Sequence, residues 1–231
     1  MIWAIVPVKD FHTAKQRLNN WLSPEERREL AAAMLSDVLR ALGRATGLDR
    51  IVLVTREPQA IARARAVGAL VIDEPFNQGE SAAVDRALAR AIGACVRAVV
   101  VIPGDVPLVS PDDVTAMVEA GRHHQVVLVP SRDQRGSNGV WLCPPDALPL
   151  CFGSDSFRLH RERAQARNLS TLVLHRPNLA LDIDTADDLH ELALRYDSHP
   201  QLAARSETAA FLRAIRWPQR FRSSGLKESR R

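Results

Sequence analysis

Residues 98–107 read AVVVIPGDVP, an unbroken apolar run followed by a turn that carries Asp105. Such a short, continuous run of Val and Ile is typical of a strand that is covered on both faces of a sheet. Comparable apolar runs occupy residues 2–8, 50–55, 69–72, 125–130, 139–143 and 171–175. We therefore expect a strand in each of these segments.

Helical patterns separate the apolar runs. Ser23 precedes a proline and two glutamates, which are the residue types of a helix start. The residues after it place apolar side chains three or four positions apart, as on one face of a helix: Leu30, Met34, Val38 and Leu42. Residues 59–67 and 81–94 follow the same pattern, and further helices are expected to start at Ser110 and Thr185. This alternation predicts an α/β fold, a three-layer α/β/α sandwich with a mostly parallel, Rossmann-like mixed sheet.

The composition is that of an ordinary soluble protein with one sizeable core, because 46% of the 231 residues are hydrophobic and 25% are charged. We predict one domain over residues 1–196 and a basic C-terminal tail over residues 197–231, partly helical or disordered. The tail holds eight Lys and Arg residues against three acidic ones, and the rest of the chain is close to neutral. It lacks a motif with interleaved aromatic residues, so we expect no nucleic-acid partner.

Cysteine usage and hydropathy indicate the cellular compartment in which the protein is expected. The three cysteines are scattered and lack the spacing of a disulfide framework or a zinc site, which fits a reducing compartment. No apolar run approaches the roughly 20 residues of a membrane span, and residues 1–10 lack the features of a signal peptide. We expect a cytoplasmic protein. The oligomeric state stays open, although an exposed apolar helix face would favour a homodimer.

Cations follow the first apolar run. Ligands of open α/β sheets bind at the carboxyl ends of the strands, so residues directly after each run are candidate site residues. Lys9, Lys15 and Arg17 fall within nine positions and suit the phosphates of a triphosphate. A basic surface loop would show the same pattern. The Gly-x-x-x-x-Gly-Lys-Ser/Thr pattern is missing, which excludes a P-loop.

Three aspartates form a candidate metal site. Asp105 follows a buried run, where a carboxylate is costly unless it is paired or bound to a cation. In an extended segment, Asp182 and Asp184 project to the same side and repel each other unless a divalent cation lies between them. Mg²⁺ is expected, because it prefers oxygen ligands and is usually shared with substrate phosphates. The three would then assemble a one- or two-metal phosphoryl-transfer site, the alternatives being ordinary turn residues.

Three polar segments contain glycine. In residues 77–81, Gly79 and Ser81 precede or begin a helix whose free amides suit phosphate or ribose oxygens. Residues 135–139 enter a strand. Residues 151–160 combine a glycine turn, hydroxyls and cations, a plausible pocket for a phosphorylated acid, although Gly, Ser and Asn also suit any turn.

The motifs occur in a recognisable order: PVK at 7–9, KQRL at 15–18, LSPEER at 22–27, MLSDVL at 34–39, PGDVP at 103–107, GSN at 136–138, FGSDSFRLH at 152–160 and LDIDTADDL at 181–189. Together they resemble the 2-phospho-L-lactate guanylyltransferase family of coenzyme F-420 biosynthesis. That family is a branch of the GT-A-like nucleotidyltransferases, which also include the molybdenum cofactor guanylyltransferases. The resemblance covers residues 1 to about 195.

The resemblance implies an enzyme that transfers GMP from GTP to a small phosphorylated acid, with release of pyrophosphate. The acid would be 2-phospho-L-lactate, phosphoenolpyruvate or 3-phospho-D-glycerate, and a downstream transferase would accept the product. The implied site has three parts. These are the Mg²⁺ ligands Asp105, Asp182 and Asp184, the phosphate-binding catalytic cations Lys9, Lys15 and Arg17, and the acceptor-acid residues Ser137, Gly153 and Ser156.

Two departures from the family pattern stand out. Gly79-Glu80-Ser81 replaces the usual Gly-Leu-Asn, which adds a charge beside the nucleotide or acceptor loop. Ser137 replaces the usual threonine and keeps the hydroxyl. Two alternatives stay open: a nucleotidyltransferase of the same fold that uses another acceptor or base, and a non-catalytic nucleotide-binding module. The presence of all three aspartates disfavours the second.

Overall fold

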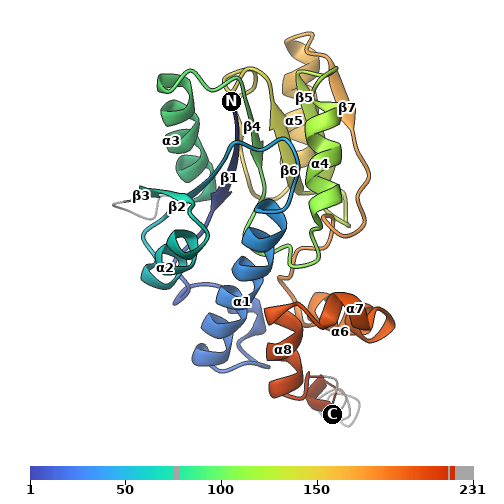
Figure 1. The fold of residues 1–231 in the computed structure, drawn as a ribbon. Coiled ribbons are helices and arrows are strands. Elements are labelled where there is room, and N and C mark those ends of the chain that lie inside the picture. The colour runs from blue at the N-terminus through green and yellow to red at the C-terminus, as the bar shows by residue number, and fades with distance from the viewer. Residues whose placement is uncertain (75–78, 218, 222–231) are drawn as a thin grey trace.

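The computed structural model describes residues 1–74, 79–217 and 219–221. A seven-stranded sheet in the order β3-β2-β1-β4-β6-β5-β7 forms its centre (Figure 1). The strands are β1 (Ile2–Pro7), β2 (Arg50–Thr55), β3 (Leu70–Asp73), β4 (Ala98–Val101), β5 (Val126–Pro130), β6 (Ser137–Leu142) and β7 (Thr171–Val173). Each predicted apolar run therefore contains a strand.

Strand direction confirms the predicted mixed, mostly parallel sheet. β1 pairs in parallel with β2 and β4, β2 with β3, and β5 with β7. β6 runs antiparallel to both of its neighbours, β4 and β5. It begins two residues before the predicted run, because the polar residues Ser137 and Asn138 are buried within the strand and do not show in a hydropathy pattern.

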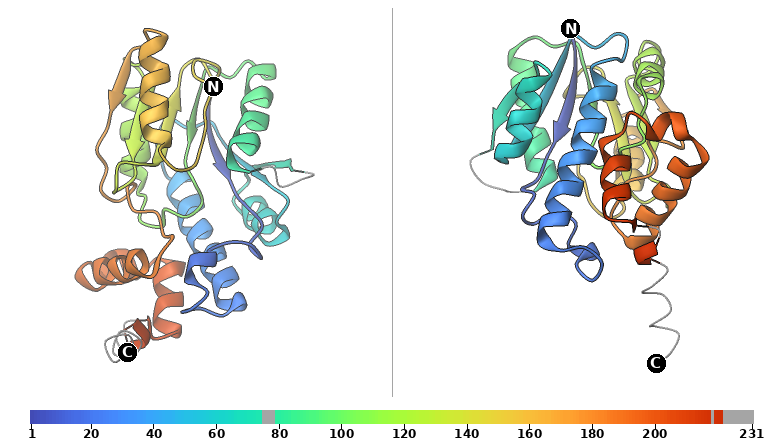
Figure 2. Two further views of the ribbon diagram at one scale, coloured as in Figure 1. Left: turned by 180° about the vertical axis from the view of Figure 1, so that it is seen from behind. Right: turned by 60° about the horizontal axis from the view of Figure 1, so that its bottom comes forward.

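Helices cover both faces of the sheet, which confirms the three-layer sandwich. Because side chains alternate along a strand, Ala4 and Val6 of β1 pack on one face and Trp3 and Ile5 on the other. The first face is covered by α1 (Pro24–Leu42), α2 (Pro58–Ala66) and α4 (Pro111–Ala120). The second is covered by α3 (Glu80–Gly93) and α5 (Ser156–Ala166), as the view from behind also shows (Figure 2, left).

The predicted helix starts are confirmed by their caps. The hydroxyls of Ser23, Ser110 and Thr185 each accept a hydrogen bond from the backbone amide three residues on, and each is part of a capping box. Thr185 caps α6 (Ala186–Ser198). Since Ser110 caps α4, Asp105 is not needed for that purpose. None of the described helices combines the length and apolar character that a membrane crossing requires.

The C-terminal part of the chain packs against α1. The predicted boundary at residue 196 falls inside α6, and α7 (Pro200–Ala203) and α8 (Glu207–Ala214) follow. A third apolar cluster joins these helices to the outer end of α1 and contains Leu30, Met34, Leu192, Tyr196, Phe211, Leu212 and Trp217. Residues 197–217 are therefore part of the core. Their basic composition hid the apolar positions, and residues 222–231 lie outside the described ranges.

A buried carboxylate on α1 holds α8 in place. Asp37 accepts hydrogen bonds from the Ser206 hydroxyl at 2.6 Å, the Glu207 amide at 2.9 Å and the Thr208 amide at 3.0 Å. It also pairs with Arg40. Because the two amides belong to the first turn of α8, the carboxylate satisfies backbone donors that the helix itself leaves unpaired.

We expect the substitution Asp37→Ala to destabilise the protein by about 2–3 kcal/mol, because it leaves these buried donors without an acceptor. Chemical denaturation measures the change. Asp197→Ala, which removes an exposed aspartate from the end of α6, is the matched control and should have little effect. Equal stability of the two variants would contradict the docking role of Asp37.

Candidate functional site

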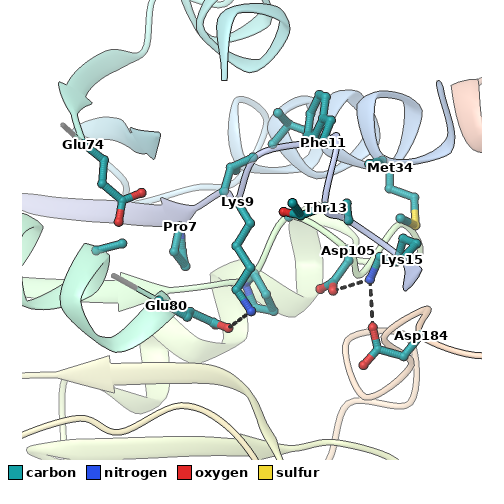
Figure 3. A pocket seen from close by; sticks show the side chains of 18 residues that line it. Pro7, Lys9, Phe11, Thr13, Lys15, Met34, Glu74, Glu80, Asp105 and Asp184 are labelled. Carbon is teal, nitrogen blue, oxygen red and sulfur yellow. Dashed lines mark hydrogen bonds and ion pairs between the residues drawn. The ribbon is translucent and has the colours of Figure 1, made fainter. Parts of the chain in front are cut away.

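The site lies where the strand order reverses. From β1 the chain passes to β2 and β3 on one side, and then returns to β4 on the other side of β1. In open α/β sheets this reversal leaves a crevice at the carboxyl ends of the two central strands. A pocket opens there, lined by Lys9 and Lys15 from the segment after β1 and by Asp105 from the turn after β4 (Figure 3).

Lys15 joins two of the predicted metal ligands. Its ammonium lies 2.7 Å from Asp105 Oδ2 and 3.0 Å from Asp184 Oδ1, and only 7% of its side chain is exposed (Figure 3). The Lys15 backbone is left-handed, with φ of 54°, and precedes the short 3₁₀ helix Gln16–Leu18. The structure therefore brings together one cation and two carboxylates that are far apart in the sequence.

The charges of this triad stabilise one another. Burial alone would lower the pKa of Lys15, but the carboxylates of Asp105 and Asp184 outweigh it and raise the pKa above its ordinary value. The Lys15 ammonium in turn is the main reason why the pKa of Asp184 is lowered, against the opposing effect of burial. Lys15 and Asp184 are therefore both charged at neutral pH.

Asp182 has a different partner. Leu181 and Ile183 are buried in the third apolar cluster, so the alternating aspartates project away from it as predicted. The Asp182 carboxylate accepts a hydrogen bond from the Asn138 side-chain amide at 3.0 Å. Burial is the largest cause that raises the pKa of Asp182. The Ile183 amide donates to the Asp105 carbonyl at 3.1 Å, which anchors this segment at the end of β4.

The carboxylates around Lys15 meet some of the requirements of a binding site for a hard divalent cation. Asp105 Oδ1 is buried without a hydrogen-bond partner in the described part of the chain, and Asp105 and Asp184 converge on one point. Among the described residues, no three or more His, Cys, Asp or Glu side chains form a group able to hold a metal ion. Mg²⁺ usually takes only one or two carboxylates together with substrate phosphates, and the residues present fit that arrangement.

The two other predicted cations flank this triad. The Arg17 guanidinium is 3.9 Å from Asp184 Oδ2, and 74% of its side chain is exposed. Lys9 Nζ lies 3.9 Å from the carboxylate of Glu80, the residue that departs from the family pattern. Burial, followed by the nearby Asp105 charge, raises the pKa of Glu80 to about 7, although Lys9 opposes this. Glu80 thus carries a partial charge at neutral pH, next to a cation predicted to bind phosphate.

Gly79 and Ser81 lie at the start of α3, where the first lines the pocket and the second forms a hydrogen bond to a neighbouring loop. Gly79 lines the pocket with φ of 96°, a conformation that favours glycine. The Ser81 hydroxyl accepts a hydrogen bond from the Phe152 amide at 2.8 Å. Ser81 therefore ties α3 to the loop that contains Gly153.

The predicted acceptor residues are brought together. The Ser137 amide donates to the Ser156 hydroxyl at 3.0 Å, and the Ser156 amide donates to the Gly153 carbonyl at 3.2 Å. Ser137 and Ser156 are both buried. Two further polar residues were not singled out by sequence reasoning, Asn138 beside Asp182 and Glu74 in the pocket around Lys15. Glu74 is buried, lines the pocket and directly follows β3, so its position after a strand was an available signal (Figure 3).

Comparison with known proteins decides the family. The family described as "Guanylyl transferase CofC like" matches residues 2–229. The chain belongs to this guanylyltransferase family. A phosphoenolpyruvate guanylyltransferase of Conexibacter woesei is 40% identical over 82% of this chain and 86% of its own length. A 2-phospho-L-lactate guanylyltransferase of Methanothermobacter thermautotrophicus is 34% identical over 83% of both chains.

Solved structures of lower sequence identity share the fold. A Desulfovibrio desulfuricans protein described as a nucleotide-diphospho-sugar transferase covers 96% of this chain and 97% of its own, with a TM-score of 0.78 and 18% identity. A nucleotidyl transferase of Methanothermobacter covers 85% and 97%, with a TM-score of 0.61 and 18% identity. The family and its guanylyltransferase relatives show that this chain is a nucleotidyltransferase, and the solved structures show that it shares their α/β fold.

We expect Glu80→Gln to stabilise this guanylyltransferase more at pH 8 than at pH 5, by about 1–2 kcal/mol. Folded Glu80 keeps its proton up to about pH 7, whereas the unfolded chain releases it at the lower, ordinary pKa of glutamate. The wild-type protein therefore loses stability as pH rises through this window, and the glutamine variant does not. Thermal denaturation at both pH values measures the difference.

The exposed Glu29 on α1 offers the matched control, because Glu29→Gln makes the same chemical change without burial. A stability difference that does not depend on pH for Glu80→Gln would show that this carboxyl titrates normally.

Proposed function

We propose that this enzyme transfers GMP from GTP to a small phosphorylated acid and releases pyrophosphate, a step of coenzyme F-420 biosynthesis. The candidate acceptors are 2-phospho-L-lactate, phosphoenolpyruvate and 3-phospho-D-glycerate. The observation that carries the proposal is the Lys15 ammonium held between Asp105 and Asp184 at the strand reversal. The relatives named as phosphoenolpyruvate and 2-phospho-L-lactate guanylyltransferases support the reaction class.

In this reaction a phosphate oxygen of the acceptor attacks the α-phosphorus of GTP. A new P–O bond forms while the bond between the α-phosphorus and the bridging oxygen breaks, and pyrophosphate leaves with that bonding pair. Negative charge builds up on the leaving pyrophosphate and on the α-phosphoryl oxygens. Lys9, Lys15 and Arg17 are the cations available to neutralise it.

Asp105 and Asp184 would hold Mg²⁺, with Asp182 close by in the same segment. When bound, the ion would neutralise phosphate charge and orient the triphosphate for in-line attack. Lys15 lowers the pKa of Asp184 and so favours its charged form, which is the state that a hard cation requires. Gly79 lines the same pocket, and the amides at the start of α3 would face the bound phosphates.

The acceptor acid is assigned to Ser137, Gly153 and Ser156, which the fold gathers around one turn. The product is an acid joined to GMP through a diphosphate. A downstream transferase that uses such an activated diphosphate must consume it. The expected location is cytoplasmic.

The nature of the acceptor is tested by a screen of GTP and the other three nucleoside triphosphates against the three acids, with Mg²⁺ present and pyrophosphate release measured. We expect turnover with GTP and at least one acid. Turnover only with a different nucleotide or acceptor would favour the alternative nucleotidyltransferase, for which Glu80 beside Lys9 is the specific structural reason. Binding of Mg²⁺-nucleotide without turnover would favour a non-catalytic module.

We expect Asp105→Asn to reduce the rate of pyrophosphate release by at least about 100-fold, because it removes a charge that faces both Lys15 and the proposed metal. The fold should be kept, as judged by circular dichroism. Asp112→Asn changes an exposed aspartate in the first turn of α4 and is the matched control. Normal pyrophosphate release by Asp105→Asn would refute the proposed metal site.

A further inference from the structure

One histidine connects two parts of the proposed acceptor site. His160 lies on α5 and is completely buried. Its Nε2 is 3.0 Å from the Cys151 backbone nitrogen, and its Nδ1 is 3.0 Å from the Ser137 hydroxyl. Cys151 begins the loop that carries Gly153, and Ser137 begins β6, so the ring lies between the loop and the sheet.

These two contacts determine which ring nitrogen carries the hydrogen. A backbone amide can only donate, so Nε2 must accept from Cys151 and is unprotonated. The hydrogen of the neutral ring is then on Nδ1, which donates it to Ser137 Oγ. Burial, together with the nearby Arg163, lowers the pKa of His160 to about 4, so the ring is neutral at pH 7.

The hydroxyl hydrogens of Ser137 and Ser156 are available to donate to a ligand. Ser137 Oγ accepts from His160, so its own hydrogen points away from the ring. Ser156 Oγ likewise accepts, from the Ser137 amide. Within the ranges that the structure describes, neither hydroxyl has a hydrogen-bond acceptor for its own hydrogen. Two adjacent donors of this kind suit an anionic oxygen.

The loop that precedes Ser156 leaves open space beside Gly153. Gly153 has φ of 129°, and a side chain built on it would meet no atom within 4 Å. Two consecutive backbone amides hold the loop around it, those of Cys151 and Phe152. The His160 ring binds the Cys151 amide, and Ser81 binds the amide of Phe152 itself. The Phe152 ring also packs edge-on against His160, with ring centroids 5.6 Å apart.

We propose that His160 is a positioning residue that directs the hydroxyl hydrogen of Ser137, which lies beside the Ser156 hydroxyl, toward an anionic oxygen of the acceptor acid. His160 itself does not touch the acid and acts through Ser137. The identity of the ligand as a phosphorylated acid rests on the proposed function, whereas the hydrogen-bond direction within the protein does not.

Three variants separate this role from simple core packing. His160→Gln removes the Nδ1 donor but places an amide oxygen near the position of Nε2. His160→Asn keeps an N–H donor near the position of Nδ1. Ser137→Ala removes the hydroxyl on which His160 acts. Each is measured with saturating GTP and varied phosphoenolpyruvate, and then with the two substrates exchanged.

We expect His160→Gln to raise the KM for phosphoenolpyruvate about 10-fold and to leave the KM for GTP within about 2-fold of wild type. His160→Asn should restore most of the acceptor affinity. The double variant Ser137→Ala with His160→Gln should have the same acceptor KM as Ser137→Ala alone, since both changes interrupt one path. His190→Gln, on α6 and outside the site, should change neither KM.

An acceptor KM that is unchanged in His160→Gln, or that rises further in the double variant, would overturn the proposal. Equal loss of affinity for both substrates would assign His160 a packing role only. If a His160 variant does not fold, Ser137→Ala still has to raise the acceptor KM for the proposal to stand.

Nitrogen NMR of the full-length wild-type protein gives a readout that does not depend on activity. The His160 ring should show a protonated Nδ1 and an unprotonated Nε2 at pH 7. The opposite tautomer would overturn the inference even in an active enzyme. The expected tautomer in a protein that transfers no nucleotide to any acceptor would instead show that the proposed function fails.

Discussion

The arrangement of this protein depends on a lysine ammonium held between two carboxylates. Lys15 contacts Asp105 and Asp184 at hydrogen-bonding distance, and the three come from the segments after β1, after β4 and before α6. Removing such a cation would leave two partly buried like charges facing each other, which is strongly unfavourable. The same contact joins the sheet to the C-terminal helices.

The packing of the C-terminal helices against α1 helps to hold Asp184 in position beside Lys15. The third apolar cluster packs α6 and α8 against α1, and Asp37 caps the first turn of α8. Because α6 begins directly after Asp184, the position of that carboxylate depends on how well α6 is docked. The C-terminal helices therefore belong to the structure of the site, although none of their own side chains lines the pocket.

Electrostatics divides the site into two halves with different properties. Around Lys15 the groups are charged and face each other across the end of the sheet. Around His160 the side chains are buried, the ring is neutral, and hydrogen bonds fix its orientation. Glu80 lies beside the charged half, and its pKa is raised to about 7. The charge next to Lys9 therefore changes with pH near neutrality. This division fits the proposed nucleotidyl transfer beside Lys15 and the proposed acceptor residues around Ser137.

The amino-acid sequence by itself determined the strands, the helix caps and the placement of Lys9, Lys15 and Asp105 at strand ends, because these follow from local hydropathy and capping patterns. The alternation of Leu181 and Ile183 with Asp182 and Asp184 was equally readable. Only the tertiary structure decided that Lys15 pairs with Asp105 and Asp184, and that Asp182 binds Asn138 instead. It also decided that residues 197–217 join the core and that His160 spans Ser137 and Cys151. These contacts join residues far apart in the chain, and their partners depend on how strands and helices cross over, which no local pattern encodes.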